Sequence, residues 1–183
     1  MSILKVNTIQ DKGGNTLLSS DGAGTLTLPS DLKNTPAFEV YLSSSQTISH
    51  ASFTKLQINT EIFDTDSCYD NTTNYRFTPT TAGKYFVYAN VMISGSGGNN
   101  LEVARIDIYK NGSRTKFSNL NMGNYDMTNF SVTITDVVDM NGSTDYLELY
   151  GYGISQTSAN ITIEGGGAGD KHSTFGAYRI IGA

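Results

Sequence analysis

Residue types that could do chemistry are spread along the chain rather than gathered in one motif. The glycine-rich run Gly165–Lys171 resembles in composition a loop that binds phosphate groups. However, Asp170 stands where a lysine should follow the last glycine, and no helical pattern comes after it, as that chemistry requires. The run is therefore predicted to be a flexible connection between strands.

A second candidate is the acidic stretch Asp64–Asp70, whose carboxylates at Asp64, Asp66 and Asp70 could supply oxygen ligands to calcium. The spacing lacks the central glycine and the closing glutamate of a calcium-binding loop. A solvated loop is the favoured interpretation, with a structural calcium ion as the alternative. No cofactor is expected on this evidence.

The remaining reactive residues have no partners in sequence. His50 and His172 are far apart and lie outside any metal or nucleophile motif, so both are expected at the surface or at an interface. Cys68 has no second cysteine and lies among aspartates, which raise a thiol pKa, so an unreactive thiol is expected. The glutamates show no pairing that would predict catalysis, and we expect no catalytic residue and no enzyme; they are Glu39, Glu61, Glu102, Glu148 and Glu164.

Charge and hydropathy exclude several kinds of partner. Only 16 % of the residues are charged, the net charge is −5, and no stretch is rich in lysine or arginine. Nucleic acids and anionic membranes need clustered positive charge, so neither is an expected partner. No apolar run approaches the ~20 residues that span a bilayer, so membrane insertion is not expected. The start of the chain also lacks the basic and long apolar regions of a signal peptide.

From Thr35 onward, short alternating apolar segments recur at the spacing of strands, and no segment shows a 3.6-residue period. The longest is Lys84–Ile93, which is aromatic and β-branched as a central strand should be. Lys110–Ser113 predicts a tight hairpin turn. The pattern predicts an all-β, antiparallel two-sheet sandwich of jelly-roll type. The expected strands are 37–42, 56–59, 62–63, 75–78, 84–93, 101–109, 130–135, 146–150 and 175–181.

These motifs, taken in order, resemble the globular C1q domain, a relative of the tumour-necrosis-factor (TNF) jelly roll. The resemblance covers roughly 35–183 and rests on 37–40, 59–64, 69–70, 77–86, 110–112, 145–149 and 173–176. It implies a ten-strand sandwich that assembles as a compact homotrimer. The loops are richer in glycine and asparagine than is usual for the family, and collagen-like repeats are absent.

A physical argument also favours self-association. The tyrosines and phenylalanines of Lys84–Ile93 and Phe175–Ile181 are placed to cover both faces of one sheet. A sheet that is apolar on both faces must bury its outer face against a partner.

The first 34 residues differ from the rest. Short strand signals surround the turn signal Asp11–Asn15, but the segment has too little apolar surface to fold alone. The stretch 4–16 resembles the opening of many marine bacteriophage fibre and appendage proteins. That resemblance implies attachment to other virion proteins and a location in the virion, assembled in the host cytoplasm. We therefore divide the chain into an anchoring or oligomerising segment, 1–34, and a C1q-like head, 35–183. The expected anchor residues are Leu4, Val6, Ile9, Leu17 and Leu26.

Three polar connections are expected at one end of the jelly roll, because antiparallel strands alternate in direction. They are 95–100, 121–126 and 156–172. Their asparagine amides and one tyrosine suit hydrogen bonding and ring stacking on a glycan. The equally weighted alternative is that they are tolerant surface loops. The expected contact residues are Asn99, Asn100, Asn124, Tyr125, Asp170 and His172.

Taken together, the sequence favours a phage virion structural protein, a tail or head fibre or appendage. In this hypothesis a homotrimer displays its C-terminal head for attachment to a glycan on the host surface. One alternative is a purely architectural decoration or adaptor of the capsid or tail. Another is a free C1q-like lectin that binds a ligand independently of any particle.

Overall fold

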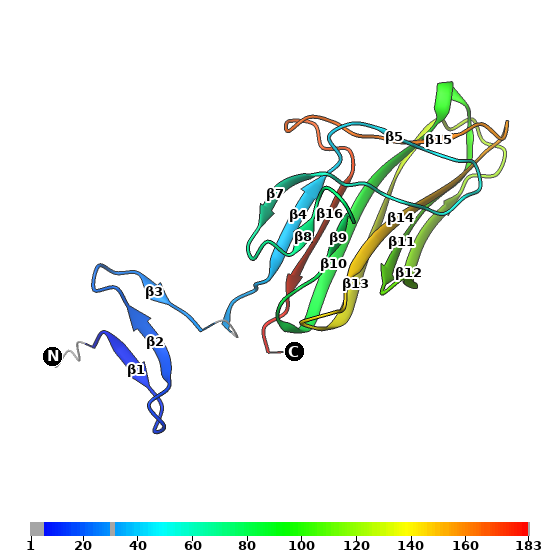
Figure 1. The fold of residues 1–183 in the computed structure, drawn as a ribbon. Helices are drawn as coiled ribbons and strands as arrows, with labels where there is room; N and C mark the ends of the chain where they lie inside the picture. The colour runs from blue at the N-terminus through cyan, green and yellow to red at the C-terminus, as the bar shows by residue number, and fades with distance from the viewer. Residues whose placement is uncertain (1–5, 30–31, 183) are drawn as a thin grey trace.

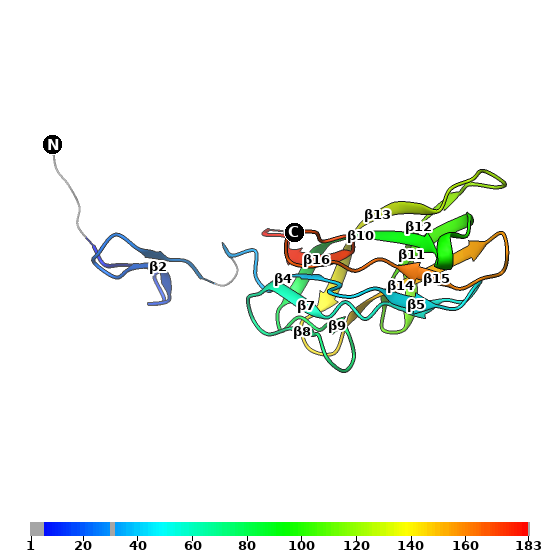
Figure 2. The ribbon, with the colours of Figure 1, turned by 90° about the horizontal axis from the view of Figure 1, so that it is seen from above.

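The computed structural model describes residues 6–29 and 32–182, and within them there is no α-helix. Near the N-terminus, β1 (Thr8–Gln10), β2 (Thr16–Ser20) and β3 (Leu26–Thr27) form a three-stranded antiparallel sheet. The turn between β1 and β2 is stabilised by Asp11, whose carboxylate accepts the N–H groups of Gly13 and Asn15 at 2.8 and 2.9 Å. This sheet lies to one side of the head (Figures 1 and 2).

The first sheet of the head is built around the long strand β10 (Ala82–Gly95), and we call it the β10 sheet. Along one side β10 pairs with β13 (Asn129–Asn141). Along the other it pairs with β15 (Ile161–Ile163) and β16 (Thr174–Arg179). The sheet continues from β15 to β5 (Gln46–Ile48), and from β16 to β4 (Ala37–Tyr41) and β7 (Thr60–Asp64).

The second sheet, which we call the β11 sheet, packs against the first. Its centre is β11 (Leu101–Lys110), paired with β12 (Ser113–Asn121) on one side and β14 (Leu147–Ser155) on the other. Beyond β14 lie β6 (Thr54–Lys55), β9 (Arg76–Phe77) and β8 (Tyr69–Asp70). A short 3₁₀ turn, η2 (Ser96–Gly98), lies between β10 and β11.

The core between the sheets is held by an aromatic cluster around the fully buried Phe38. Its ring stacks on Phe77 and Tyr69, at centroid distances of 4.5 and 4.8 Å, and meets Phe175 edge to face at 5.1 Å. These rings come from β4, β8, β9 and β16, so the cluster joins the two sheets. Burying such rings accounts for a large share of the hydrophobic free energy of a small domain.

The antiparallel sandwich confirms the expected fold class. The predicted hairpin turn is also confirmed, because Asn111 and Gly112 join β11 to β12 with φ of 52° and 76°. The strand expected at 56–59 is wrong. Leu56 and Ile58 are buried, but the backbone there connects β6 to β7. The sequence analysis also missed β5, β6, β8, β12 and β15.

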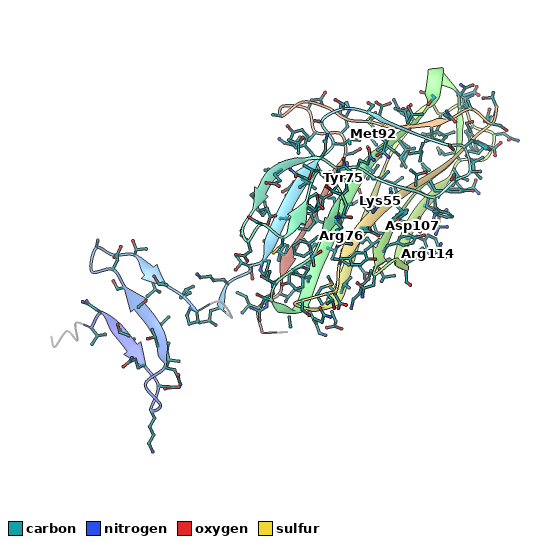
Figure 3. The ribbon with its side chains drawn as sticks, viewed as in Figure 1. Lys55, Tyr75, Arg76, Met92, Asp107 and Arg114 are labelled. Atoms are coloured by element: carbon teal, nitrogen blue, oxygen red, sulfur yellow. The ribbon has the colours of Figure 1, made fainter. Side chains whose placement is uncertain are left out.

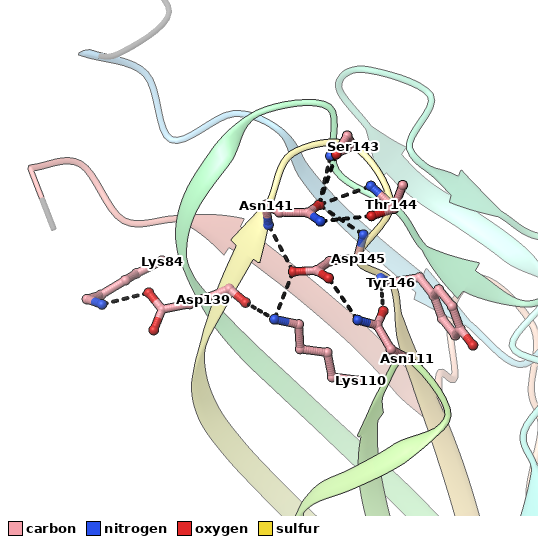
Figure 4. A network of polar contacts seen from close by, with 9 residues as sticks. All are labelled: Lys84, Lys110, Asn111, Asp139, Asn141, Ser143, Thr144, Asp145 and Tyr146. Carbon is pink, nitrogen blue, oxygen red and sulfur yellow. Dashed lines mark hydrogen bonds and ion pairs between the residues drawn. The ribbon is translucent and has the colours of Figure 1, made fainter.

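At the end of the head where the chain enters and leaves, a polar network joins two turns (Figure 4). The Asn141 side-chain oxygen accepts the backbone N–H groups of Ser143, Thr144 and Asp145, each at 3.0 Å. Asp145 in turn contacts Lys110 at 2.8 Å, and Lys110 is the main reason that the pKa of Asp145 is lowered. The network fixes the β13–β14 turn against the β11–β12 hairpin.

Phe38→Ala is expected to lower the free energy of unfolding by about 3–5 kcal/mol, because it empties the centre of the aromatic cluster. Urea unfolding followed by fluorescence measures this change. Tyr125→Ala is the control, because that ring is 76 % exposed and its loss should change the free energy little. Equal effects of the two substitutions would contradict this account of the core.

Candidate functional site: an aromatic sheet face and the loops at one end

The first half of the strand β10 carries aromatic and apolar side chains on both of its faces. Its inward side chains, such as Tyr85, Val87 and Ile93, are fully buried in the core. Its outward side chains include Phe86 and Tyr88, which point away from the β11 sheet. The expectation that aromatic residues cover both faces of one sheet is therefore confirmed.

The outward rings gather on one part of the β10 sheet, which we call the aromatic face. Phe86 lies between Tyr178 of β16 and Val137 of β13 in the strand register. Its ring centroid is 5.4 Å from that of Tyr178 and 6.2 Å from that of Tyr88. Val137, Tyr178 and Phe63 of β7 are exposed. Phe86, Tyr178 and Val137 therefore form an apolar surface that is partly exposed in the described residues, and Glu39 separates it from Phe63.

Tyr88 lies across Gly176, and a Cβ atom at that glycine would come within 2.5 Å of the phenol ring. The Tyr88 hydroxyl donates to the Glu39 carboxylate at 3.3 Å. Burial, together with the neighbouring Glu39 charge, raises the pKa of Tyr88 to about 12. Glycine at position 176 thus allows the ring to lie flat on the sheet.

The aromatic face becomes polar toward the far end of β10. Asn90 accepts a hydrogen bond from Thr133 at 3.0 Å and donates one to the His172 carbonyl at 3.2 Å. Farther along, the Ser94 hydroxyl donates to Glu164. Apolar and polar contacts are thus separated along one strand, with the apolar part near the point where the chain enters the head (Figure 1).

Three loops come together at the opposite end of the head. Asn100 donates to Asp126 at 2.7 Å, and Asn99 accepts from Thr157 at 2.7 Å. Gln156 donates to the Tyr125 carbonyl at 3.4 Å, and the Tyr125 ring itself is exposed. The loops 96–100, 121–128 and 156–160 therefore form one polar surface, which includes Asn99, Asn100, Asn124 and Tyr125.

The stretch 156–172 is not one connection, because β15 divides it. Asp170 and His172 consequently lie on a separate loop beside β4, where the Gly166 N–H donates to the Leu42 carbonyl. The Asp170 carboxylate and His172 Nε2 are 3.0 Å apart. Their loop, 164–173, lies at the same end of the head as the other loops (Figure 1), but the hydrogen bonds that join those loops do not include Asp170 or His172.

The other candidate residues of the sequence have structural partners. The glycine-rich run leads into the strand β16, which confirms the predicted strand connection. Asp70 accepts the N–H groups of Thr72, Thr73 and Asn74, and these bonds lower its pKa. Asp64 accepts the Tyr69 N–H at 2.7 Å. The aspartates of this loop therefore cap its own turns.

Burial is the main cause that raises the pKa of Cys68, with the Asp64 and Asp66 charges as smaller causes. His50 accepts the backbone N–H of Ser155 at 3.3 Å. Glu39 and Glu148 lie on the outer faces of different sheets, so the sandwich separates them. Within 6–29 and 32–182, no group of three or more histidine, cysteine, aspartate or glutamate residues is arranged to hold a metal ion.

The N-terminal sheet leaves its apolar side chains uncovered. Val6, Ile9 and Leu26 line a shallow hollow with Leu18, and Leu17 is exposed as well. Leu4 lies outside the described residues. In the part of the chain that the structure describes, no helix is long and apolar enough to cross a membrane.

Sequence analysis missed a charged cluster on the outer face of the β11 sheet. Asp107 is fully buried there and accepts two hydrogen bonds from the Arg105 Nε at 3.0 and 3.1 Å and one from its Nη2 at 2.5 Å. Arg114 Nε of β12 is 3.8 Å from the same carboxylate. The spacing of Arg105 and Asp107, two residues apart on one strand, could have indicated their contact. The contact of Arg114 with Asp107 joins two strands and has no such local signal.

Solved structures with the same fold are domains of the TNF and C1q families. Eiger TNF from S. frugiperda has a TM-score of 0.59 and 10 % identity, covering 80 % of this chain and 93 % of that chain. The globular domain of zebrafish complement 1qA protein has a TM-score of 0.55 and 12 % identity, covering 79 % and 97 %. Murine APRIL at pH 8.0 has a TM-score of 0.56 and 8 % identity, covering 79 % and 98 %. No protein-family model and no curated protein matches the chain.

These similarities confirm the C1q/TNF-like jelly roll that the sequence motifs predicted. At such low identity they show the fold alone. The resemblance of the N-terminal segment to phage fibre proteins is not tested by them and stays a prediction.

Stability is expected to fall as the pH rises from about 10 to 12, because Tyr88 ionises near pH 10 in the unfolded chain but at about 12 in the fold. A group with a raised folded pKa stabilises the fold below its unfolded pKa, and this contribution is lost as the pH approaches the folded value. Tyr88→Phe should lose less stability over this range, as measured by urea unfolding at pH 9, 10 and 11. Identical alkaline slopes for the two proteins would contradict the assignment.

Proposed function

We propose that the chain is a structural protein of a phage virion. In this proposal a homotrimer presents its C1q-like heads for attachment to a glycan on the host surface. The observation that carries it is the aromatic face of the β10 sheet, an apolar surface on the outside of an already complete sandwich. Such a surface is typical of a permanent contact between subunits.

Self-association would cover this face. Phe86, Tyr88 and Tyr178 are held in fixed positions by the strand register and by each other, so little side-chain entropy is lost on docking. Glu39 is the acidic side chain beside these rings, and its carboxylate accepts the Tyr88 hydroxyl. Three copies of the chain would also place three identical ends side by side, which raises the avidity of weak contacts.

Attachment to a particle is supported by the N-terminal sheet. A small sheet with Val6, Ile9 and Leu26 uncovered has too little buried apolar area to be stable by itself. A partner surface on the virion, or the same segment of two other copies, would supply the missing contacts. The loops that include Tyr125 lie at the opposite end of the head from this segment (Figure 1), so an anchored particle would present them outward.

The full chain is expected to elute with three times the mass of one chain in light scattering. Replacing both Phe86 and Tyr178 by threonine should give monomers, because the change makes the aromatic face polar while keeping β-compatible residues. The matched control is Phe53→Thr, which removes an exposed ring next to the β11 sheet, just before β6, and should leave the trimer intact. A monomeric wild-type protein would overturn the proposed assembly.

Two measurements on particles test the virion role. Deletion of residues 1–30 should prevent incorporation into virions, which is read from the protein content of purified particles. Added full-length chain should block adsorption of particles to host cells. Incorporation without competition at saturating protein would favour a purely architectural role. Absence of the undeleted chain from purified particles, together with binding to host cells that survives the deletion, would favour a free lectin.

A further inference from the structure

We infer that the outer face of the β11 sheet is the glycan-binding surface, and that it takes a saccharide that carries carboxylate groups. The inference rests on the proposed attachment function and deepens it. It moves the contact from the loops at the end of the head to the broad side of the sandwich, and it names the chemistry of the ligand.

The centre of this surface is a group of five side chains, which we call the arginine cluster. It consists of Phe53, Arg105, Asp107, Arg114 and Phe117. The Arg105 guanidinium lies between two rings, 4.0 Å from the Phe117 centroid and 5.0 Å from that of Phe53. The same guanidinium donates hydrogen bonds from its Nε and Nη2 to the buried Asp107 carboxylate. Arg105 is thus fixed in position before any ligand arrives.

The cluster presents positive charge to solvent. Two guanidinium groups face one carboxylate, and that carboxylate is fully buried whereas Arg114 is exposed. The neighbouring pair has the same arrangement, since Lys55 contacts the buried Glu148 at 2.8 Å and keeps its own side chain partly exposed. Figure 3 shows Lys55, Asp107 and Arg114 spread across this sheet. In a chain of net charge −5, this local excess of positive charge favours an anionic ligand.

Exposed rings accompany these charges. Phe53 and Phe117 are 42 % and 49 % exposed, on either side of Arg105. Tyr152 stacks on Phe53 at 4.6 Å, and Tyr150 stacks on Tyr109 at 4.2 Å in the next rows of the sheet. Flat apolar rings bind the apolar faces of sugar rings, while an exposed guanidinium binds a carboxylate through two parallel hydrogen bonds. A carboxylated pyranose offers both groups within one residue.

The shape of the surface favours a glycan over other anions. The cluster lies on the broad face of a sheet, whereas extended peptides dock in grooves or on sheet edges. Nucleic acids are bound by long rows of cations, which this face lacks. The face also lies on the opposite side of the sandwich from the aromatic face, so the proposed trimer leaves it accessible.

The test is calorimetric titration of the full chain with oligogalacturonate, a pyranose polymer that carries one carboxylate per ring. We expect binding that weakens as salt is added. Arg114→Gln should lower the affinity by about tenfold or more, since it removes a charge-assisted contact. Lys116→Gln is the matched control, because it removes one charge from the same strand at a comparably exposed side chain, and it should change the affinity by less than about twofold.

A second variant tests the contribution of the aromatic rings, and two other ligands separate the effect of charge from that of the sugar rings. Phe117→Thr should also weaken binding, because it removes a stacking ring. Dextran, which has no charge, and poly-glutamate, which has charge without sugar rings, should bind far more weakly than oligogalacturonate. The inference is overturned by absence of oligogalacturonate binding at low salt, by equal binding of poly-glutamate, or by equal effects of Arg114→Gln and Lys116→Gln.

Two results separate this inference from the proposed function. Loss of binding in Tyr125→Ser but not in Arg114→Gln would place the contact on the end loops and overturn the inference while the attachment role stands. Likewise, if added wild-type chain blocks particle adsorption and the Arg114→Gln chain blocks it equally well, attachment is retained and the arginine cluster is excluded. Weaker competition by Arg114→Gln than by Lys116→Gln would support the inference.

Discussion

The structure of the head depends on a single strand, β10, that has apolar side chains on both faces. Its inward residues complete the core, and the aromatic cluster around Phe38 fills the space between the sheets beside it. Its outward rings lie outside this core, because successive side chains of a strand point to opposite faces and the sandwich uses one of them. The alternation of side chains along β10 therefore places one set in the core and the other set on the aromatic face. The same strand contributes to the stability of the monomer and to the proposed contact between monomers.

The outer faces of the two sheets carry different kinds of side chain. On the β10 sheet the outer face is apolar around Phe86 and Tyr178, and the ion pair of Lys84 and Asp139 lies in the next row. Glu39, at the edge of these rings, accepts the Tyr88 hydroxyl. On the outer face of the β11 sheet, the buried carboxylates of Asp107 and Glu148 each form an ion pair with a more exposed cation, Arg105 and Lys55 respectively. A buried carboxylate is tolerable only with such hydrogen-bonded partners, because an unpaired one would be strongly destabilising. One side of the sandwich is thus suited to a permanent partner and the other to a soluble, charged one.

Much of the fold could be predicted from the sequence, because long strands and tight turns have local signals. The alternation of Lys84–Ile93 and the turn at Asn111–Gly112 were sufficient to place the centre of each sheet. The strand β12 was missed because Ser113–Asn121 is mostly polar, as suits a strand that is largely exposed. The segment 56–59 was mistaken for a strand because burial of Leu56 and Ile58 mimics strand alternation. The arginine cluster could not be predicted, since it depends on the register between β11 and β12, where a bulge at Ile108 and Tyr109 shifts Arg114.

The polar composition of β12 has a consequence for how copies of the chain can meet. This strand ends its sheet, and among the described strands it pairs only with β11, so its other edge can meet the backbone of a neighbouring chain. The exposed Arg114 and Lys116 along that row repel a second copy of the same edge, a common protection of edge strands against sheet extension. Edge-to-edge growth would be open-ended and would produce fibrils. By discouraging it, the charged edge leaves the sheet faces as the surfaces through which copies of the chain could associate without forming an extended sheet.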